Sequence, residues 1–264
     1  MGSSEDKVHF DQAIVRPPGS SFAQGITNAN LGVPDLDLAQ EQHQAYCEAL
    51  EMCGVSLVVM QPDAEFPDST FVEDTAVLTR NCAVLTLPGA TSRRGEVESI
   101  KTVISRYFEN IQTIRPPGTL EGGDICQVDN HFFIGISERT NANGAQQLAS
   151  ILVRDGYTSS FVNLRRNSEF LHLKSGIAYL GDSRLVLAKG MERLAKFEGY
   201  EIIYAEHGES YAANCLRVND YVLVAKGFPK IKAKLAQLGY QVHQVEVSEF
   251  QKMDGGLSCL SLRF

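Results

Sequence analysis

A short alternation of polar and apolar segments recurs four times along the chain. Each copy has a polar residue, an apolar run, a turn containing Asn or Asp, and a second apolar run. The copies begin at Val72, Glu121, His172 and Asn214. Apolar runs bounded by turn residues predict paired β-strands, because Asn, Asp and Gly tolerate the backbone angles of tight hairpin turns. A fifth polar residue, Cys259, precedes the apolar segment that closes the sequence.

A helical pattern and then a further strand follow most of these hairpins. Apolar residues spaced i, i+3, i+4 and i+7 predict amphipathic helices at residues 93–108, 141–153 and 231–238. The strands expected after them are residues 111–114, 159–164 and 241–247. In the third copy the helix is shortened to residues 192–197. The repeating unit is therefore predicted to be ββαβ.

The two ends of the chain complete a fifth unit. Its strands are expected at residues 258–264, 10–16 and 55–60, and its helix at residues 36–52. Five polar positions, Glu73, Glu121, His172, Asn214 and Cys259, which we call the repeat heads, recur at intervals of 48, 51, 42 and 45 residues. Periods of about 40–50 residues are typical of radial or stacked repeats. The alternative is an irregular α/β domain in which the similarity is coincidental.

We therefore expect an α/β fold with five modules in a ring, closed by the N- and C-termini, as one domain over residues 1–264. Closure of this kind removes the exposed terminal repeats that solenoid proteins must cap. Residues 1–8 are expected to form a flexible tail. Residues 19–32 are rich in Gly, Ser and Asn without periodicity, and they predict a mobile, lid-like loop.

Composition excludes several classes of protein. The formal net charge is −8, and no run of Lys and Arg exceeds two residues, which argues against nucleic-acid binding and allows a small cationic ligand. No segment has the apolar length of a signal peptide or membrane span. Six cysteines without a CxxC spacing predict reduced thiols in the cytoplasm and no structural zinc site.

The repeat heads carry a set of reactive side chains that a ring would bring together. Cys259 follows a double glycine, which lets the backbone approach a ligand closely. A thiolate there is a stronger nucleophile than a serine hydroxyl, and His172 could transfer protons beside it. The other five cysteines lie in apolar patterns or at a helix end and are predicted to be structural. The alternative is that Cys259 and His172 are also ordinary core residues.

Carboxylates gather at two of the repeat heads. Glu73 and Asp74 are adjacent in FVEDT, and Glu121 begins EGGD. Their spacing is not that of metal ligands, and a guanidinium group offers a planar set of donors that matches two carboxylates. A bound guanidinium would also supply the positive charge that favours a thiolate. The alternative is that these carboxylates cap turns or pair with surface arginines.

The motifs FPDSTFVEDTAV, SRRGE, PGTLEGGDI, RTNANGA, LHLKSG, YAANC and DGGLSCLSLRF resemble those of the dimethylargininases of the short bacterial type. The resemblance extends from about Ile14 to Phe264. It implies the five-bladed α/β-propeller, or pentein, fold of the guanidine-modifying enzymes, in agreement with the repeat. Departures lie in the N-terminal tail and the lid-like loop, and they concern substrate preference rather than the reaction.

The resemblance also implies a role for each matching residue. Cys259 matches the nucleophile, His172 the general acid and base, and Glu121 the residue that holds and orients the guanidine and the histidine. Those matching substrate-binding positions are Glu73 and Asp74 for the guanidinium, Asp68 for the α-amino group, Arg93 and Arg139 for the α-carboxylate, and Ile26 and Met253 for backbone contacts.

The expected reaction is hydrolysis of Nω-methylated arginine, a small cationic amino acid, to citrulline without a cofactor. One alternative is an arginine deiminase-like hydrolase of unmethylated arginine or another amidine. A second is a non-catalytic protein that binds arginine derivatives. Zinc bound by Cys259 and His172 would inhibit the enzyme, since thiolate and imidazole are good zinc ligands. The sequence leaves a homodimer open.

Overall fold

The computed structural model describes residues 9–165 and 169–264, and the expected tail at residues 1–8 lies outside them. The strands are β1 Gln12–Val15, β2 Ser56–Val59, β3 Ala76–Leu78, β4 Ala83–Leu85, β5 Ile111–Thr113, β6 Ile125–Val128, β7 His131–Ile136, β8 Thr158–Asn163, β9 Ile177–Tyr179, β10 Arg184–Ala188, β11 Glu201–Ala205, β12 Leu216–Val218, β13 Tyr221–Ala225, β14 Gln241–Val245 and β15 Leu262–Arg263. The α-helices are α1 Leu36–Met52, α2 Glu96–Ile104, α3 Ala142–Arg154, α4 Pro229–Gln237 and α5 Ser248–Gln251.

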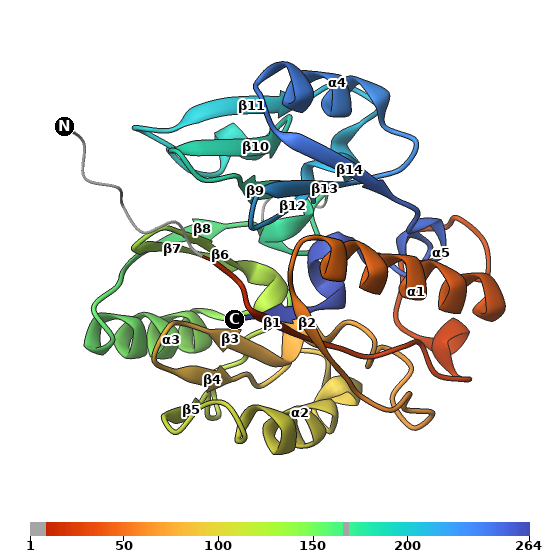
Figure 1. Cartoon of the computed structure of the whole chain (residues 1–264). Helices are drawn as coiled ribbons and strands as arrows, with labels where there is room; N and C mark the ends of the chain where they lie inside the picture. The colour runs from red at the N-terminus through yellow and green to blue at the C-terminus, as the bar shows by residue number, and fades with distance from the viewer. Residues whose placement is uncertain (1–8, 166–168) are drawn as a thin grey trace.

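The strands form five three-stranded sheets, one for each predicted module. Their orders are β3-β4-β5, β6-β7-β8, β9-β10-β11, β12-β13-β14 and β15-β1-β2. In every sheet the first two strands are antiparallel and the last two are parallel. Figure 1 shows the sheets following one another around the molecule with α1–α4 on the outside. The ββαβ prediction is confirmed in four modules.

The fifth module joins the two ends of the chain as predicted. Strand β15 pairs with β1 in antiparallel register, with Ile14 opposite Leu262, and β1 continues in parallel with β2. The helix α1 between β1 and β2 has the predicted bounds. Asp35 caps it by accepting a hydrogen bond from the Leu38 N–H at 3.0 Å, which satisfies one of the free donors at a helix start.

A cavity of about 680 Å³ runs along the axis of the ring. The first strand of every module, β3, β6, β9, β12 and β15, contributes residues to its lining, so the five modules surround it. The hairpin-turn residues Asp129, Gly181 and Asn219 lie at one end of the lining, and Glu73 and Ser258 lie at the segments that carry the repeat heads. The radial arrangement inferred from the repeat spacing is therefore confirmed.

The main difference from the sequence-based prediction is a 3-10 turn in every module. These turns are η2 Val72–Thr75, η4 Gly122–Asp124, η5 Leu173–Ser175, η7 Ser210–Ala213 and η8 Leu257–Leu260. Each repeat head lies in one of these turns or directly beside it, rather than at the start of a strand. One turn of 3-10 helix is too short to show a periodicity, so the apolar pattern of the next strand concealed it. Turn η8 occupies Leu257–Leu260, where the strand at residues 258–264 was expected to begin, so β15 has only two residues.

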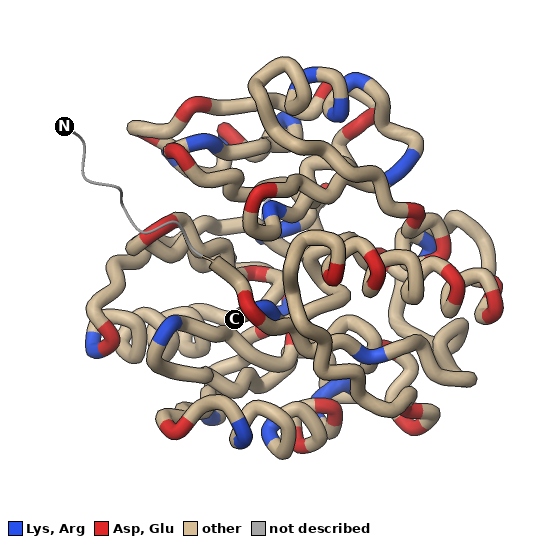
Figure 2. The backbone as a smooth tube through the Cα atoms, viewed as in Figure 1, with Lys and Arg blue, Asp and Glu red and all other residues tan. Residues whose placement is uncertain are grey.

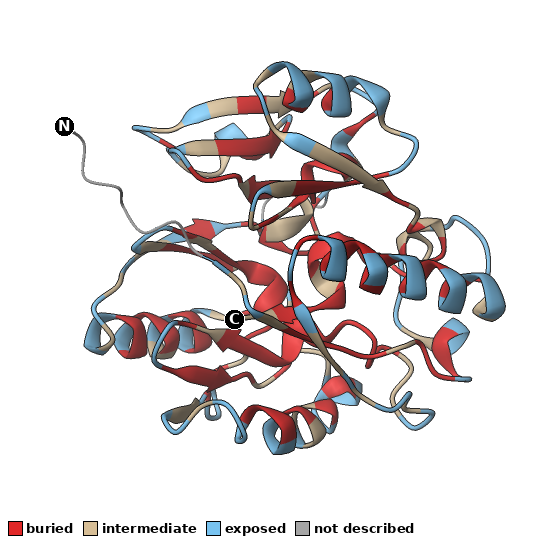
Figure 3. Ribbon diagram, in the orientation of Figure 1, coloured by how far each residue is buried: buried red, intermediate tan, exposed pale blue. Residues whose placement is uncertain are grey.

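Two helices are shorter than predicted. Helix α2 begins at Glu96, because Thr91–Arg93 forms a separate 3-10 turn that buries the Arg93 side chain. In the third module a 3-10 turn at Met191–Arg193 replaces the expected helix. Within the described residues no helix has the length and apolarity needed to cross a membrane. Figure 3 shows buried residues in the central strands and exposed residues on the outer faces of the helices.

The loop at residues 19–32 is packed in its first half. Phe22 is fully buried, and its ring lies 6.2 Å from that of Phe71 and 5.5 Å from that of Phe250. Burial of a phenylalanine of this kind contributes roughly 1.5–3 kcal/mol. Most residues from Ile26 to Val33 are exposed. Movement of a lid therefore stays a prediction, and it concerns this second half.

Gly122, the first residue of η4, provides a test of how closely the turns that carry the repeat heads must approach one another. A Cβ at Gly122 would lie 2.0 Å from the Glu73 carbonyl oxygen, so Gly122→Ala forces η2 and η4 apart. We expect a loss of unfolding free energy of at least about 2 kcal/mol, measured by urea denaturation. Gly208→Ala is the control, because nothing lies within 4 Å and only its φ of +85° opposes alanine, at about 1 kcal/mol. Equal losses would contradict the close-approach argument.

Candidate active site

The 3-10 turns bring the repeat heads to one end of the ring. Turn η2 contacts both η4 and η8, η4 contacts η5, and η5 contacts η7. The predicted convergence of the heads is confirmed by this series of contacts, which includes all five modules. Each turn directs one or two polar side chains inward, and the strands behind the turns fix their positions.

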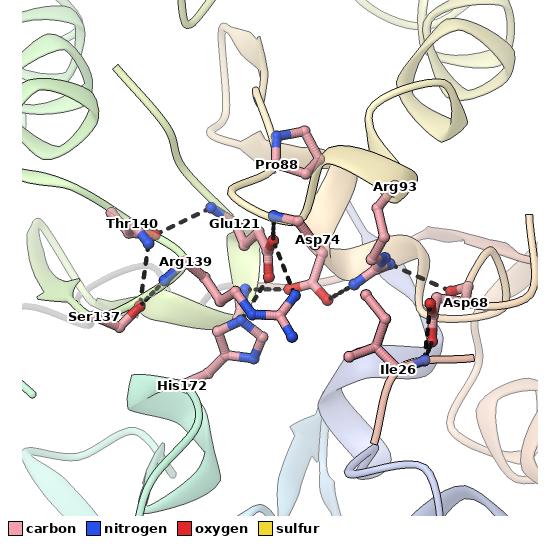
Figure 4. A network of polar contacts seen from close by, with 12 residues as sticks. Ile26, Asp68, Asp74, Pro88, Arg93, Glu121, Ser137, Arg139, Thr140 and His172 are labelled. Atoms are coloured by element: carbon pink, nitrogen blue, oxygen red, sulfur yellow. Dashed lines mark hydrogen bonds and ion pairs between the residues drawn. The ribbon is translucent and has the colours of Figure 1, made fainter. Parts of the chain in front are cut away.

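Three titratable side chains from three modules lie together at this end. Single ligand-type atoms of Asp74, Glu121 and His172 lie within 4.8 Å of one another, and all three residues are buried. His172 Nε2 is 2.8 Å from Glu121 Oε2 (Figure 4). The other oxygen of Glu121 accepts a hydrogen bond from the Ala90 N–H at 3.1 Å. The predicted pairing of His172 with Glu121 is therefore present.

The pair is charged at neutral pH. Burial alone lowers the pKa of His172, but the negative charges of Asp74, Asp124 and Glu121 outweigh it and raise this pKa to about 9. Burial likewise disfavours the Glu121 carboxylate, but the hydrogen bond and charge of His172 and the charge of Arg93 lower the pKa of Glu121 to about 2. His172 therefore carries a proton that it can donate.

The charge on His172 should make stability depend on pH. An exposed histidine has a pKa near 6.5, so the folded chain gains stability from this group below pH 6.5 and loses it as pH rises through the folded pKa of about 9. The variant His172→Gln lacks this contribution. We expect urea denaturation to show the wild type losing more than about 1 kcal/mol relative to His172→Gln between pH 6.5 and pH 9. If the difference in unfolding free energy between the wild type and His172→Gln were the same at both pH values, the raised pKa of His172 would be contradicted.

Cys259 lies in η8, at the fifth repeat head. The other five cysteines are buried as predicted, whereas Cys259 is partly exposed. Burial, together with the charges of Glu73 and Asp74, raises the pKa of the Cys259 thiol to about 12. The thiol is therefore protonated at neutral pH in the absence of a ligand. A cation bound beside it would lower this pKa and favour the thiolate.

Arg93 holds Asp74 in place. Its Nη1 donates to Asp74 Oδ2 at 2.6 Å, and its Nε and Nη2 donate to Glu96 at 3.0 and 2.9 Å. The same guanidinium donates to the carbonyls of Asp68 and Phe71 at 3.3 and 3.1 Å. Arg93 is buried, and nearly all its donors are used by the protein. Its predicted contact with a substrate carboxylate stays a prediction, and its contacts indicate a supporting role.

Arg139 is placed differently. Its guanidinium makes an ion pair with Glu121 Oε1 at 3.5 Å, and its side chain is 15% exposed. The backbone before it is fixed by Ser137, whose hydroxyl accepts hydrogen bonds from the N–H groups of Arg139 and Thr140 at 3.0 and 3.1 Å. Arg139 therefore keeps donors that can reach a ligand, as its predicted role requires.

Asp68, Ile26 and Met253 meet around Gly25. The Asp68 carboxylate accepts the Ile26 N–H at 3.1 and 3.2 Å (Figure 4). A Cβ at Gly25 would lie 2.5 Å from Asp68 Oδ1 and 3.0 Å from Met253 Cε, so a side chain there would collide with both. Burial raises the pKa of Asp68, while Arg93 opposes this effect. Three of the five residues predicted to bind the amino-acid end of a ligand are thus neighbours.

The contacts of the Glu73 carboxylate differ from those expected for its predicted role, which was to bind the guanidinium of the substrate. Its carboxylate accepts hydrogen bonds from Lys174 Nζ at 2.6 Å and Ser258 Oγ at 2.8 Å, and it pairs with Arg263 at 3.5 Å. Contact of Glu73 with a guanidinium therefore stays a prediction. The sequence-based reasoning missed Lys174, Ser258 and Arg263. Lys174 lies two positions after the repeat head His172, and Ser258 directly precedes the repeat head Cys259, which was the signal available.

Asp124 is a further residue that the sequence did not single out. It is fully buried, accepts the Leu173 N–H at 3.1 Å and the Ser137 hydroxyl at 2.7 Å, and its charge favours protonated His172. Its place directly after the double glycine of EGGD was the available signal. Asp124 thus connects the His172 segment with the segment that carries Arg139.

The predicted inhibitory zinc site at Cys259 and His172 stays a prediction. In the described part of the chain, the grouped ligand-type atoms are those of Asp74, Glu121 and His172. Each of these carboxylates already accepts hydrogen bonds from protein donors. Figure 2 shows Lys and Arg interspersed with Asp and Glu along the chain in this view.

Comparisons with known proteins agree with this geometry. The family model described as arginine deiminase matches residues 64–220. The dimethylarginine dimethylaminohydrolase of Pseudomonas aeruginosa is 46% identical over 97% of this chain and 100% of its own length. The enzyme of the same name from Streptomyces coelicolor is 34% identical over 96% of both chains. A solved structure of the Pseudomonas aeruginosa enzyme, a cysteine-to-serine variant with citrulline, has a TM-score of 0.94 and 45% identity, and covers 97% of this chain and 100% of that one.

Proposed function

The chain belongs to the dimethylarginine dimethylaminohydrolase family and is a hydrolase of Nω-methylated arginines, and we propose that Cys259 and His172 carry out its chemistry. One observation carries this assignment. His172 Nε2 lies 2.8 Å from Glu121 Oε2 in a buried cluster with Asp74, and the contact of η2 with η8 brings Cys259 to the same end of the ring. Burial and the charges of Glu73 and Asp74 raise the pKa of Cys259 to about 12, so a bound cation would favour its thiolate. A guanidinium group is a cation that also contains the electrophilic carbon.

The substrate is held at both ends in this proposal. Asp74 and Glu121 face the guanidinium as charged acceptors. Asp68 receives the α-amino group and Arg139 the α-carboxylate, while the backbone of Ile26 and Met253 lines the amino-acid end. Arg93 fixes Asp74 and the Asp68 carbonyl rather than the substrate. Holding both ends orients the guanidinium carbon toward the sulfur, and orientation of this kind supplies several kcal/mol of rate acceleration.

In the first half-reaction the bound guanidinium favours loss of the Cys259 thiol proton to solvent, and the resulting thiolate forms a bond to the guanidinium carbon. His172, which is protonated because its pKa is about 9, donates its proton to the departing methylamine or dimethylamine nitrogen as the C–N bond breaks. The products are the free amine, an S-alkylthiouronium on Cys259 and a neutral His172. Splitting the hydrolysis through this covalent intermediate replaces one difficult step by two easier ones.

In the second half-reaction neutral His172 removes a proton from water. The hydroxide adds to the thiouronium carbon, the C–S bond breaks, and the proton of the new hydroxyl passes to the departing sulfur, so citrulline leaves and the Cys259 thiol is restored. Glu121 stabilises the imidazolium that forms again, because its Oε2 lies 2.8 Å from His172 Nε2. The same carboxylate therefore assists both proton transfers, as expected for a histidine that acts first as acid and then as base.

Release of citrulline and amine from asymmetric dimethylarginine, monomethylarginine and arginine, measured side by side, tests the function. The proposal expects turnover of the methylated substrates with release of the methylated amine. The match of residues 64–220 to the arginine deiminase model favours a second candidate, hydrolysis of arginine with release of ammonia. Turnover of arginine alone would select that candidate. No turnover of any of the three would overturn both.

A small cationic amino acid is the partner that this site requires. A homodimer and a location in the cytoplasm stay predictions.

A further inference from the structure

Four of the five repeat heads have a place in the proposal above, whereas Asn214, the fourth, has none. Asn214 is buried at the end of η7, between the segments that carry His172 and Cys259. Its side-chain amide makes three hydrogen bonds. Oδ1 accepts the Ser258 N–H at 3.0 Å, and Nδ2 donates to the Lys174 carbonyl at 2.9 Å and to Ser258 Oγ at 3.1 Å.

These partners are the immediate neighbours of the reactive residues. Ser258 directly precedes Cys259 on η8, and Lys174 lies two residues after His172 on η5. We propose that Asn214 is a positioning residue that sets the separation of Cys259 and His172 by linking their two turns. This inference rests on the proposed function, since it assigns Asn214 a part in the same reaction.

The link belongs to a closed ring of hydrogen bonds. The Ser258 hydroxyl accepts from Asn214 Nδ2 and donates its single hydrogen to Glu73 Oε2 at 2.8 Å. Glu73 Oε1 in turn binds Lys174 Nζ at 2.6 Å, and the Lys174 carbonyl returns to Asn214. An amide suits this position because it provides a donor and an acceptor at once. A leucine of similar size would leave the Ser258 N–H and the Lys174 carbonyl without these partners.

The double glycine before Cys259 supports the same inference. A Cβ at Gly256 would lie 2.7 Å from Asn214 Cγ, so the backbone of η8 approaches the amide more closely than another residue would allow. Gly256 adopts φ −141° and ψ −178°, which any residue can adopt. The close approach of Asn214, rather than the backbone angles, therefore accounts for glycine at this position.

The test compares two asparagines with equal numbers of hydrogen bonds. Asn219 also makes three, to the Phe10 N–H, the Phe10 carbonyl and the Cys53 carbonyl, at the opposite end of the ring. Asn214→Gly and Asn219→Gly remove the same atoms, and glycine accepts the φ of +52° at position 219 without strain. Kinetics with asymmetric dimethylarginine and the midpoint of urea unfolding are measured for both.

We expect kcat to fall about 100-fold in Asn214→Gly, the effect of a displacement of about 1 Å in the reacting groups, with KM changed less than about 3-fold. Asn219→Gly should lose comparable stability and keep kcat within about 3-fold of the wild type. If kcat in Asn214→Gly is retained, or falls equally in Asn219→Gly, Asn214 is merely structural and the inference is overturned. A wild type that releases no citrulline would instead sink the proposed function.

Asn214→Asp keeps the test decisive if the glycine variant does not fold. Aspartate still accepts the Ser258 N–H but cannot donate to the Lys174 carbonyl or to Ser258 Oγ, so the link to the His172 turn is lost while one of the two links to η8 remains. We expect kcat to fall by at least about 10-fold with KM again nearly constant. Wild-type kcat in Asn214→Asp would show that this link does not set the geometry, and would overturn the inference.

Discussion

Replacement of Cys259 by serine is expected to lower citrulline release by at least about 10⁴-fold, which is the order of loss when a nucleophile is removed from a covalent mechanism. A serine hydroxyl is far less acidic than a thiol, and the bound guanidinium cannot lower its pKa enough to form the alkoxide. Binding should survive, because Asp68, Arg139 and Asp74 are unchanged. Calorimetric titration of the Cys259→Ser variant with asymmetric dimethylarginine should therefore give a Kd close to that with which the wild-type protein binds the same compound.

The matched control is Cys82→Ser. Cys82 is 1% exposed in the hairpin of the first module, where its Sγ lies 3.7 Å from the Ala83 carbonyl and it packs in an apolar cluster shared with the second module. The same exchange of sulfur for oxygen there should reduce stability and leave kcat within about 3-fold of the wild type. Turnover of Cys259→Ser above one hundredth of the wild-type rate, with citrulline as product, would argue against a covalent intermediate on Cys259.

The repeat made the fold predictable. Because the hairpins alternate polar heads with apolar strands at a nearly constant spacing, the sequence predicted five ββαβ units and their closure through β15 and β1. What the pattern did not contain was the 3-10 turn of each module, since three residues in one turn show no periodicity. Those turns matter, because they, and not the strand ends, place Glu121, His172 and Cys259.

The candidate site was predictable in part, for the repeat heads Glu121 and His172 but not for the repeat head Glu73. Glu121 and His172 meet as expected because equivalent positions of neighbouring modules lie side by side at the axis. Residues one or two positions from a head were not predictable, because a strand or a turn can direct such side chains to either face. Lys174 and Ser258 are of this kind, and they engage the Glu73 carboxylate that the family pattern had given to the substrate.

Replacement of Asp74 by asparagine has the second-largest expected effect. Asp74 is the carboxylate between Arg93 and the His172 cluster: its Oδ2 accepts from Arg93 Nη1 at 2.6 Å, and its Oδ1 accepts the Gly123 N–H at 2.8 Å. The amide of asparagine cannot provide the negative charge that the guanidinium of the substrate requires. A charge-assisted contact contributes about 1.5–3 kcal/mol, so kcat/KM for asymmetric dimethylarginine should fall about 100-fold. Loss of the Asp74 charge should also lower the pKa of His172.

Glu96→Gln separates this effect from the loss of an ion pair with Arg93. Glu96 also binds the guanidinium of Arg93, at 2.9 Å, but it belongs to α2 rather than to the cluster with His172. Burial raises the pKa of Glu96 to about 7, whereas Arg93 opposes this shift. Because Glu96 and Arg93 are both buried, Glu96→Gln should lose stability, but Asp74 keeps its charge, so we expect kcat/KM to stay within about 5-fold of the wild type. Equal losses of kcat/KM in Asp74→Asn and Glu96→Gln would mean that Asp74 acts only by holding Arg93. The guanidinium of the substrate would then be bound elsewhere.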